Sequence, residues 1–385
     1  MRKRLGIFVT HPVQYHVPIW RALAASSDLD VTVHYFSDMS VRGGIDPGFG
    51  VPVAWDTPML EGYKSRFISR DADVTKCNRL RIPDIVNLLD EEKFDFILIN
   101  GYTCAFERQI VRYAKKKSTK VILRGEFTDS PRPGRSVIKK YLREIYLKWF
   151  YSGVDKFCYV GVEAKNHLQK IGIPSNKMFF SPYSVDNGFF ETQKQQLNRV
   201  ECRAQLGLGN NDFTFLCSGK LIPRKMPLLL AEAVLSLPEN NKIALIFVGD
   251  GPQKSNIETS LRPVLKNRLI LPGFVNQSGL GKYFIASDAF ILPSNFETWG
   301  LVVNEAMIFS LPVIVSDAVG CRKDLVIPQK TGFIFQSGNV DSLANSMREM
   351  LARPEMAKIL GNNAYKKIKE YSVSESVQGI LDAIR

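Results

Sequence analysis

The segment 294–307 places two carboxylates around a glycine at a spacing that suits a phosphate-containing ligand. It reads Ser-Asn-Phe-Glu-Thr-Trp-Gly-Leu-Val-Val-Asn-Glu-Ala-Met, with Glu297 before Gly300 and Glu305 inside an apolar run. The pattern predicts a loop followed by a helix over 301–309. A helix N-terminus presents unpaired backbone N–H groups and the positive end of the helix dipole, so it can bind a phosphate. We expect Glu297 beside that anion and Glu305 on the helix, accepting hydrogen bonds from the vicinal hydroxyls of a ribose.

Both acids also have a simpler interpretation. Glu297 could cap the helix, and Glu305 could be a surface charge. An unpaired carboxylate in a mostly apolar helix is costly to remove from water, which favours a ligand for Glu305. Gly300 adds to this interpretation because a residue without a Cβ lets the backbone approach a ligand closely.

The elements that must position these residues follow an alternating pattern. Strand-like apolar runs alternate with amphipathic segments, which predicts βαβ units and parallel sheets. The predicted strands are 5–10, 31–36, 96–100, 120–123, 156–160, 213–218, 244–248, 269–271, 289–292 and 313–316. The predicted helices are 18–25, 81–89, 108–115, 136–151, 227–236, 253–261, 301–309, 340–351 and 355–370.

The pattern breaks once, around Asp186-Asn187-Gly188, and the polar stretch 191–198 that follows is typical of a linker. A chain of 385 residues is also too long for one comfortable core. We therefore predict two doubly wound domains, 1–188 and 189–370, with 371–385 as a C-terminal helix that could pack back on the first. A ligand would bind in the crevice between them, at the carboxyl ends of the strands.

Composition limits the function classes. The chain is 45% hydrophobic and 23% charged, as in soluble globular proteins, and its net charge is +13. That charge indicates an anionic partner: nucleic acid, a membrane surface or a polyanionic substrate. No zinc finger, RNP-like strand or basic zipper is present in the sequence. Anionic small molecules or lipid headgroups are therefore preferred as partners over nucleic acid.

Cysteines, histidines and the N-terminal residues point to a cytosolic protein. The six cysteines are scattered and never form CxxC, so we expect neither disulfides nor zinc clusters. The four histidines lack a metal-ligand pattern, and no metal is expected. No run approaches the roughly 18 apolar residues of a membrane span. The apolar residues 5–10 are too short for a signal-peptide core.

The motif around Glu297 and Glu305 resembles that of retaining GT-B glycosyltransferases, in particular glycosyltransferase family 4 (glycosyl transferases group 1). That family has the same Glu-x7-Glu spacing. Further matches are GKLIPRK at 219–225, VGDGP at 248–252, LPVIVS at 311–316 with Gly320 after it, and the weaker PYSVD at 182–186. The resemblance is good from about residue 213 to 351 and weaker in the first half. It implies a GT-B fold, with two Rossmann-like domains facing a cleft.

The resemblance implies a catalytic role for Glu297, Lys225 and Lys220. Glu297 would contact hydroxyls of the donor sugar. The two lysines, just beyond the strand 213–218, would clamp one diphosphate. Together with the helix N-terminus they would stabilise the departing nucleoside diphosphate without a metal ion. Lys220 replaces the arginine usual in the family, which keeps the charge but loses the planar bidentate fork.

Other residues would complete the donor site. Glu305 would bind the ribose, and backbone N–H groups near Trp299, Gly300 and Leu301 would hold sugar and phosphate. Gly219 and Gly251 belong to the matching loops. The donor would be a UDP- or GDP-sugar, with its base selected by contacts around 249–253 and 274–276.

The resemblance specifies the acceptor-binding residues less closely than the donor-binding ones. The family usually has a glycine-rich loop after the first strand, but here the polar residues His11, Gln14, Tyr15 and His16 stand there. Either histidine could bind a sugar or phosphate, or could simply pack beneath its neighbours. Many relatives also carry a histidine near Arg124-Gly125-Glu126, and this chain has none. Arg124 or Glu126 could replace that sugar contact, or the two could form a plain ion pair.

The segment 137–151 is amphipathic, basic and aromatic. Such a helix can lie at an anionic membrane surface. We prefer the interpretation in which one face packs on the sheet and the lysines are solvated. The membrane interpretation stays open because a lipid-linked acceptor would require it, with peripheral attachment at the inner face of the cell membrane.

Together these features predict a retaining sugar transferase that acts on a glycan, glycolipid or lipid-linked saccharide in surface-polysaccharide assembly. A GT-B nucleotide-sugar epimerase is one alternative, but it would need catalytic carboxylates and histidines that the sequence does not clearly provide. A non-catalytic nucleotide- or carbohydrate-binding protein is another, against which the intact Lys220, Lys225, Glu297 and Glu305 argue. A basic nucleic-acid-binding protein is the third.

Overall fold

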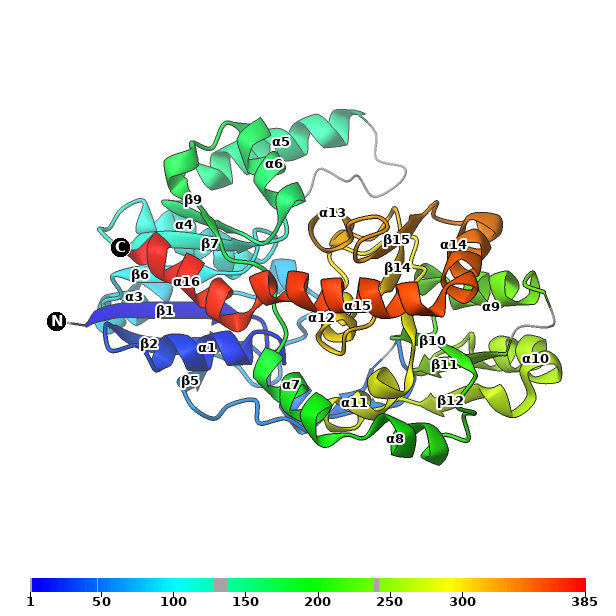
Figure 1. Cartoon of the computed structure of the whole chain (residues 1–385). Coiled ribbons are helices and arrows are strands. Elements are labelled where there is room, and N and C mark those ends of the chain that lie inside the picture. Colours follow the sequence, from blue (N-terminus) through cyan, green and yellow to red (C-terminus); the bar gives the residue numbers. More distant parts are fainter. Residues whose placement is uncertain (1, 47, 128–136, 239–241) are drawn as a thin grey trace. The chain divides into compact units, whose positions relative to one another are not determined.

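The computed structural model describes residues 2–46, 48–127, 137–238 and 242–385, and the chain divides into two compact units (Figure 1). The first unit comprises residues up to 42, residues 58–183 and Val373–Arg385. The second comprises Gly43–Thr57 and Ser184–Ser372. Each unit contains a parallel sheet with helices packed against it, so the predicted class of two Rossmann-like α/β domains is confirmed.

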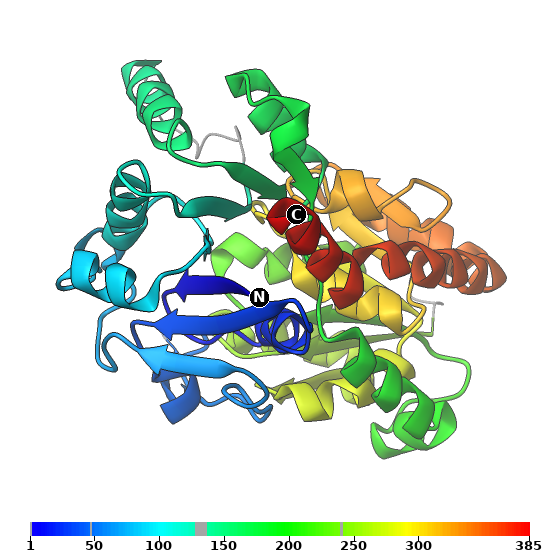
Figure 2. The ribbon, with the colours of Figure 1, turned by 90° about the vertical axis from the view of Figure 1, so that its left-hand side faces the viewer.

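The sheet of the first unit has seven parallel strands in the order β5-β2-β1-β6-β7-β8-β9. These are β1 (Lys3–Val9), β2 (Leu29–Tyr35), β5 (Lys64–Phe67), β6 (Phe96–Ile99), β7 (Lys120–Gly125), β8 (Lys156–Tyr159) and β9 (Met178–Phe180). Figure 2 shows the blue strands β1 and β2 side by side. The central strands are nearly continuous apolar runs because both faces of a parallel sheet are covered by helices.

The helices of the first unit come from both ends of the chain. They are α1 (Val17–Ala24), α2 (Met39–Arg42), α3 (Ile85–Glu92), α4 (Ala105–Ala114), α5 (Val137–Tyr151), α6 (Val162–Ile171) and α16 (Val373–Ile384). Helix α16 packs against α1 and β9. At Gly379 it approaches so closely that a Cβ would lie 1.8 Å from the carbonyl oxygen of Phe180. Ile380, Ala383 and Ile384 join the core of this unit.

The sheet of the second unit has six parallel strands in the order β12-β11-β10-β13-β14-β15. They are β10 (Phe213–Ser218), β11 (Ile243–Val248), β12 (Leu269–Gly273), β13 (Ala289–Leu292), β14 (Val313–Ser316) and β15 (Gly332–Phe335). A separate two-stranded sheet pairs β3 (Gly44–Ile45) with β4 (Pro52–Val53). The helices are α7 (Asn187–Gln196), α8 (Arg199–Gln205), α9 (Pro227–Leu235), α10 (Lys254–Leu265), α11 (Gln277–Ala286), α12 (Leu301–Ile308), α13 (Arg322–Leu325), α14 (Val340–Ala352) and α15 (Pro354–Ile368).

Three details differ from the expectations. The predicted linker 191–198 is largely the helix α7, whose N-terminus is capped by the Asp186 carboxylate accepting from the Phe189 N–H at 3.1 Å. Residues 43–57, assigned to the first domain from the sequence, pack with the second unit. The predicted C-terminal helix 371–385 begins at Val373, and residues 371 and 372 belong to the second unit. Residue 136, the first of the predicted helix 136–151, lies outside the described ranges.

The expectation that all cysteines are unpaired is wrong for one pair. Cys77 and Cys104 form a disulfide, with Cα atoms 4.5 Å apart. The pair meets because the chain before α3 returns to the N-terminus of α4, where the Phe106 N–H donates to the Leu80 carbonyl at 2.8 Å. Such a long-range approach leaves no mark in the spacing of the cysteines. The free cysteines, Cys158, Cys202, Cys217 and Cys321, are all buried.

Candidate functional site

The strand order of the second unit places the predicted donor residues at one edge. The chain runs outward from β10 to β11 and β12, and then returns to add β13 on the other side of β10. The loops after β10 and β13 therefore leave the sheet in opposite directions. Such a topological switch point opens a ligand-binding crevice at the carboxyl ends of the strands. Lys225 lies in the first of these loops and Glu297 in the second.

Lys225 and Glu297 are joined across this switch point. The Lys225 ammonium contacts Oε1 of Glu297, and their side chains are 19% and 11% exposed. Arg224 Nη1 lies 3.6 Å from the same oxygen. The Ser294 hydroxyl donates to it at 3.4 Å. The two loops are also tied directly, because Arg224 donates to the Phe296 carbonyl at 2.7 Å.

The loop after β14 holds the backbone of Glu297 through hydrogen bonds. The Glu297 N–H donates to the Ala318 carbonyl at 3.2 Å, and the Gly320 N–H donates to the Glu297 carbonyl at 3.0 Å. A Cβ on Gly320 would lie 1.9 Å from the Thr298 carbonyl oxygen, so only glycine allows this approach. The carboxylate of Glu297 is thus positioned by its neighbours before any ligand binds.

Helix α12 begins immediately after this loop. Gly300 is its N-cap with φ 100°, a left-handed conformation that favours glycine. The first N–H groups of the helix have no partner within the helix and can bind an anion. Glu305 lies on α12 and is only 2% exposed. Burial of a carboxylate without pairing would be costly, so the interpretation of Glu305 as a surface charge is wrong.

The Trp299 side chain does not face the loop. It is buried, and its indole Nε1 donates to Oδ1 of Asn304 at 3.0 Å. Its ring also packs against Tyr371 with centroids 6.0 Å apart. Trp299 therefore anchors the start of α12 through its side chain, and only its backbone remains for the predicted contact with sugar or phosphate.

Glycines bring two strand ends together beneath Lys220. A Cβ on Gly249 would lie 1.9 Å from the Gly219 carbonyl oxygen, and one on Gly251 would lie 2.6 Å from the Leu221 carbonyl oxygen. Hydrogen bonds join the same loops, from the Gly219 N–H to Val248 and from the Leu221 N–H to Asp250, both at 2.9 Å. Gly219 and Gly251 thus build the base of the site through their backbones.

Lys220 has a different partner from Lys225. Its ammonium donates to both carboxylate oxygens of Asp46, at 2.7 and 2.9 Å. The two lysines predicted to share one diphosphate are therefore each neutralised by a separate acid. Asp46 carries no motif in the sequence, so it was not predicted.

The first unit has its own switch point, between β1 and β6. The predicted residues His11 and His16 lie in the loop after β1. Burial lowers the pKa of His11. Burial also lowers the pKa of His16 to about 3, and the charges of Arg124 and His11 add to this. Gln14 and Tyr15 lie half-buried in the turn before α1.

Arg124 and Glu126 make internal contacts. Arg124 is fully buried; its Nε donates to the Ser181 hydroxyl at 2.9 Å and its Nη2 to the Pro182 carbonyl at 3.0 Å. Its guanidinium also lies over the Tyr183 ring, 5.2 Å from the centroid. Burial and the hydrogen-bonded Glu126 raise the pKa of Tyr183. These contacts tie β7 to the chain after β9.

Asn100 is a residue that the sequence analysis missed. It follows β6, and the pairing of Phe8 with Ile99 places it level with Val9 at the switch point. Both polar atoms of its side chain are buried, and in the described ranges neither has a hydrogen-bond partner. A buried amide without partners is costly, so this amide is available to hydrogen-bond a ligand or a water molecule. The available signal was a polar residue directly after an apolar strand.

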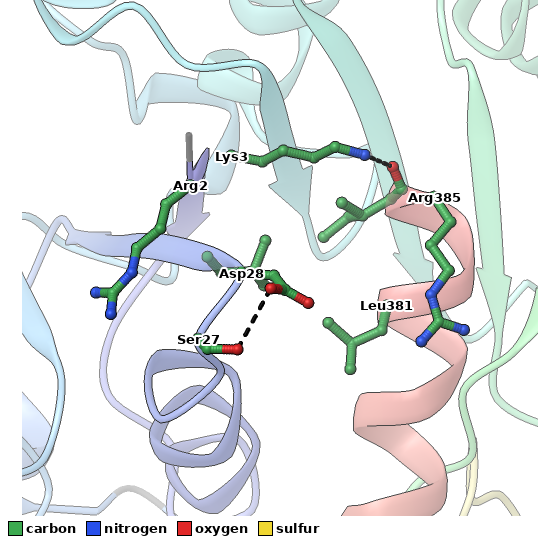
Figure 3. A pocket seen from close by; sticks show the side chains of 8 residues that line it. Arg2, Lys3, Ser27, Asp28, Leu381 and Arg385 are labelled. Atoms are coloured by element: carbon green, nitrogen blue, oxygen red, sulfur yellow. Dashed lines mark hydrogen bonds between the residues drawn. The ribbon is translucent and has the colours of Figure 1, made fainter.

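A pocket of about 410 Å³ lies at the opposite, amino edge of the first sheet (Figure 3). Its lining includes Lys3 and Asp28, near the starts of β1 and β2. The Lys3 ammonium donates to the Ile384 carbonyl at 2.9 Å, which caps α16. The pocket is thus a seam around the C-terminal helix, away from the edge that carries the predicted residues. Across the ranges described, no group of three or more His, Cys, Asp or Glu side chains is placed to hold a metal ion.

Comparison with known proteins identifies relatives of this chain. Residues 198–367 match the family model "Glycosyl transferases group 1". The chain is 35% identical over 224 residues to the UDP-Gal:alpha-D-GlcNAc-diphosphoundecaprenol alpha-1,3-galactosyltransferase of Escherichia coli, covering 56% of each chain. It is 25% identical over 292 residues to the alpha-galactosylglucosyldiacylglycerol synthase of Streptococcus pneumoniae, covering 73% of this chain and 75% of that one. The alignment thus spans little more than half of the E. coli relative.

Solved structures share the whole fold. The sucrose-phosphate synthase of Thermosynechococcus elongatus superposes with a TM-score of 0.73 at 19% identity, covering 100% of this chain and 98% of that one. Anabaena HepE in complex with UDP gives a TM-score of 0.73 at 16% identity, covering 100% and 99%. At these identities the likeness concerns the fold, and it confirms the predicted GT-B architecture.

The half-buried His16 makes the first unit sensitive to acid. Its pKa is about 3 in the folded chain against 6.5 for an ordinary histidine. Between these values the unfolded chain binds a proton that the folded chain does not, so stability falls as the pH decreases below about 6.5. We expect His16→Gln to reduce the loss of unfolding free energy between pH 8 and pH 5 by about 1–2 kcal/mol. Urea unfolding of both proteins at the two pH values measures this, and an identical loss in the variant would contradict it.

Proposed function

We propose, from the match of residues 198–367 to the family model "Glycosyl transferases group 1", that this chain transfers a sugar from a nucleotide-sugar donor to a glycan, glycolipid or lipid-linked saccharide. The observation that carries the proposal is the ion pair of Lys225 and Glu297 beside the N-terminus of α12. A cation, a carboxylate and unpaired backbone N–H groups match the diphosphate and hydroxyls of a nucleotide sugar.

Each donor group has a residue to receive it in this proposal. The diphosphate binds the N–H groups of Gly300 and Leu301 together with Lys225 and Lys220. Glu297 binds hydroxyls of the transferred sugar, and Glu305 binds the ribose. The E. coli relative is named for UDP-Gal as its donor, and HepE was solved with UDP. Both support UDP before GDP as the nucleotide of this donor.

We further propose that transfer retains the anomeric configuration. The acceptor hydroxyl attacks the anomeric carbon from the face of the leaving group, while the bond from that carbon to the phosphate oxygen breaks. The leaving phosphate oxygen takes the proton of the acceptor hydroxyl, so no side chain has to act as base. The protein contributes positioning and charge stabilisation, with Lys225, Lys220 and the α12 N-terminus offsetting the charge of the diphosphate without a metal ion.

We assign acceptor binding to the residues that follow the carboxyl ends of the strands in the first sheet. Asn100 offers a donor and an acceptor of hydrogen bonds that no described side chain uses. The neutral rings of His11 and His16 at the same switch point can each bind a hydroxyl. Arg124 and Glu126, whose contacts are internal, act in this proposal as supports for the edge. The relatives named for an undecaprenol-linked and a diacylglycerol acceptor support a lipid-linked substrate here.

Helix α5 supports a membrane surface as a partner. The core packing preferred from the sequence applies to its C-terminal part, where Leu147, Phe150 and Tyr151 are buried. The rest exposes an apolar stripe, in which Ile138, Tyr141, Leu142 and Ile145 are 72%, 65%, 58% and 49% exposed.

Basic residues surround that stripe. Lys139, Arg143 and Lys148 lie on the same helix. Arg112 and Lys115 lie over the Trp149 ring, each 5.5 Å from its centroid. Exposed apolar side chains beside cations are the features of a helix that lies in the headgroup region of an anionic bilayer. Within the part of the chain that the structure describes, no helix is long and apolar enough to cross a membrane.

Removing the charge of either member of the Lys225–Glu297 pair should strongly reduce transfer. A screen of UDP- and GDP-sugars with lipid-linked acceptors first identifies the donor, and kcat/KM is then measured for Lys225→Met and Glu297→Gln. Lys225→Met should lose about 100- to 1,000-fold, because charge stabilisation at a departing group is worth that much. Glu297→Gln should lose about as much, because it removes the charged acceptor that holds hydroxyls of the transferred sugar in place. NMR of the product should show the anomeric configuration of the donor.

The exposed pair of Lys358 and Glu355 on α15 provides matched controls. Lys358→Met and Glu355→Gln change the same residue types in a second Lys–Glu pair and should keep wild-type rates. Full activity in both Lys225→Met and Glu297→Gln would refute the site, and an inverted product would refute the retaining mechanism.

Membrane binding should depend on the α5 stripe. Leu142→Glu should weaken binding to vesicles containing phosphatidylglycerol by about tenfold or more, because it replaces an inserted apolar side chain with a charge. Ile359→Glu, at a 61% exposed position on α15, is the matched control and should bind like the wild type. Co-sedimentation at low and high salt measures both. Equal binding by all three proteins would exclude α5 as the contact.

A further inference from the structure

Residues 43–46 and 48–57 form a strap that packs with the second unit. Its strands β3 and β4 pair antiparallel, and Asp46 organises the connection between them. The Asp46 N–H donates to the Val51 carbonyl at 3.1 Å. Oδ1 of Asp46 accepts the N–H groups of Gly48 at 2.7 Å and Phe49 at 3.1 Å. The carboxylate therefore holds a fixed position at the tip of the strap.

The strap is anchored on the residues that follow β12. Asn276 Nδ2 donates to the Ala54 carbonyl at 2.6 Å, and the Ser278 N–H donates to Asp56 at 3.2 Å. The Phe274 ring lies between two strap side chains. Its centroid is 5.0 Å from that of Phe49 and 6.2 Å from that of Trp55. The segment 274–276 is also where the proposed nucleotide would contact the protein through its base.

At the tip, the strap surrounds Lys220. Both Asp46 oxygens accept from its ammonium, as described above. The Phe49 ring lies 5.0 Å from the same nitrogen. A Cβ on Gly48 would lie 2.5 Å from Lys220 Cδ, so the strap backbone also packs on the lysine stem. Two oxygens of one anionic group facing this ammonium is the arrangement that a phosphate would present.

We propose that this strap lies across the donor site and that Asp46 is a counter-ion which the donor diphosphate displaces from Lys220. The inference rests on the proposed function. Asp46 and Lys220 are 30% and 33% exposed, so water reaches the pair and it can open at moderate cost. A diphosphate carries more charge than one carboxylate and also gains the helix N-terminus.

The same geometry gives Asp46 a role after transfer. Burial raises the pKa of Asp46, but hydrogen bonds from Lys220, Gly48 and Phe49 outweigh it and hold that pKa below its usual value. Asp46 is therefore ionised at neutral pH and competes with the bound diphosphate for Lys220. That competition weakens the binding of the nucleoside diphosphate product and favours its release.

Calorimetric titration of the full chain with UDP, GDP and inorganic pyrophosphate tests this. Asp46→Asn keeps an oxygen for the Gly48 and Phe49 N–H groups but removes the charge. It should bind pyrophosphate, and the nucleoside diphosphate that the wild type prefers, about three- to tenfold more tightly. Asp341→Asn is the matched control, since it makes the same change at an exposed acid in the first turn of α14, outside the strap. It should bind within twofold of the wild type.

A second pair of variants ties the effect to Lys220. In a Lys220→Met background, Asp46→Asn should give no gain. A gain of the same size there, or binding by Asp46→Asn that equals or falls below the wild type, would overturn the counter-ion role. Binding by Asp46→Asn alone would support it. If neither the wild type nor Asp46→Asn binds UDP, GDP or pyrophosphate, both the proposed function and this inference are refuted. If the wild type binds and Asp46→Asn binds no more tightly, only this inference is refuted.

Discussion

The ion pair between Lys225 and Glu297 depends on one topological constraint and organises the rest of the site. In the second sheet, β13 returns to the far side of β10, so the loops after these two strands diverge. Each loop carries one charge, and the pair closes the gap between them. Gly320 and Gly249 allow the neighbouring backbones to approach as closely as this requires, and Gly300 adopts the left-handed conformation that begins α12. The adjacent N-terminus of α12 then adds unpaired N–H groups to the same edge.

Both lysines of the site have an acid partner without a donor. Glu297 neutralises Lys225, and Asp46 neutralises Lys220. Unpaired lysines in partly buried positions would be costly to desolvate, so these acids stabilise the empty site. A ligand that displaces these acids must supply equivalent negative charge to the lysines. A nucleoside diphosphate provides the negative charge that replaces them at both lysines, and the freed Glu297 can then bind hydroxyls of the sugar. Donor recognition in this account is an exchange of anions.

Sequence reasoning succeeded where the signal is local. The run from Ser294 to Met307 indicated the loop, the glycine and the helix α12, and all three are present. Alternating apolar and amphipathic segments were enough to predict two Rossmann-like units. Lys225 and Glu297, 72 residues apart, were brought together only through the resemblance, and the structure places them in contact.

The features that were missed arise from contacts between distant segments. Asp46 lies 174 residues from Lys220, and nothing in its neighbourhood marks it as a partner. Asn100 is significant only because its amide is buried without a partner, which a sequence does not reveal. The Cys77–Cys104 disulfide depends on how the chain returns to α4. On α5, periodicity indicated an amphipathic helix but not that its apolar residues before Leu147 would be exposed.

A crystal structure of the chain with its preferred nucleoside diphosphate tests the central claim most directly. The account predicts diphosphate oxygens within about 3 Å of the Gly300 or Leu301 N–H and of the Lys225 ammonium, with ribose hydroxyls on Glu305. It also predicts that the Asp46–Lys220 contact opens. A nucleotide bound elsewhere, such as the pocket beside Lys3 and Asp28, would contradict the assignment of the donor site.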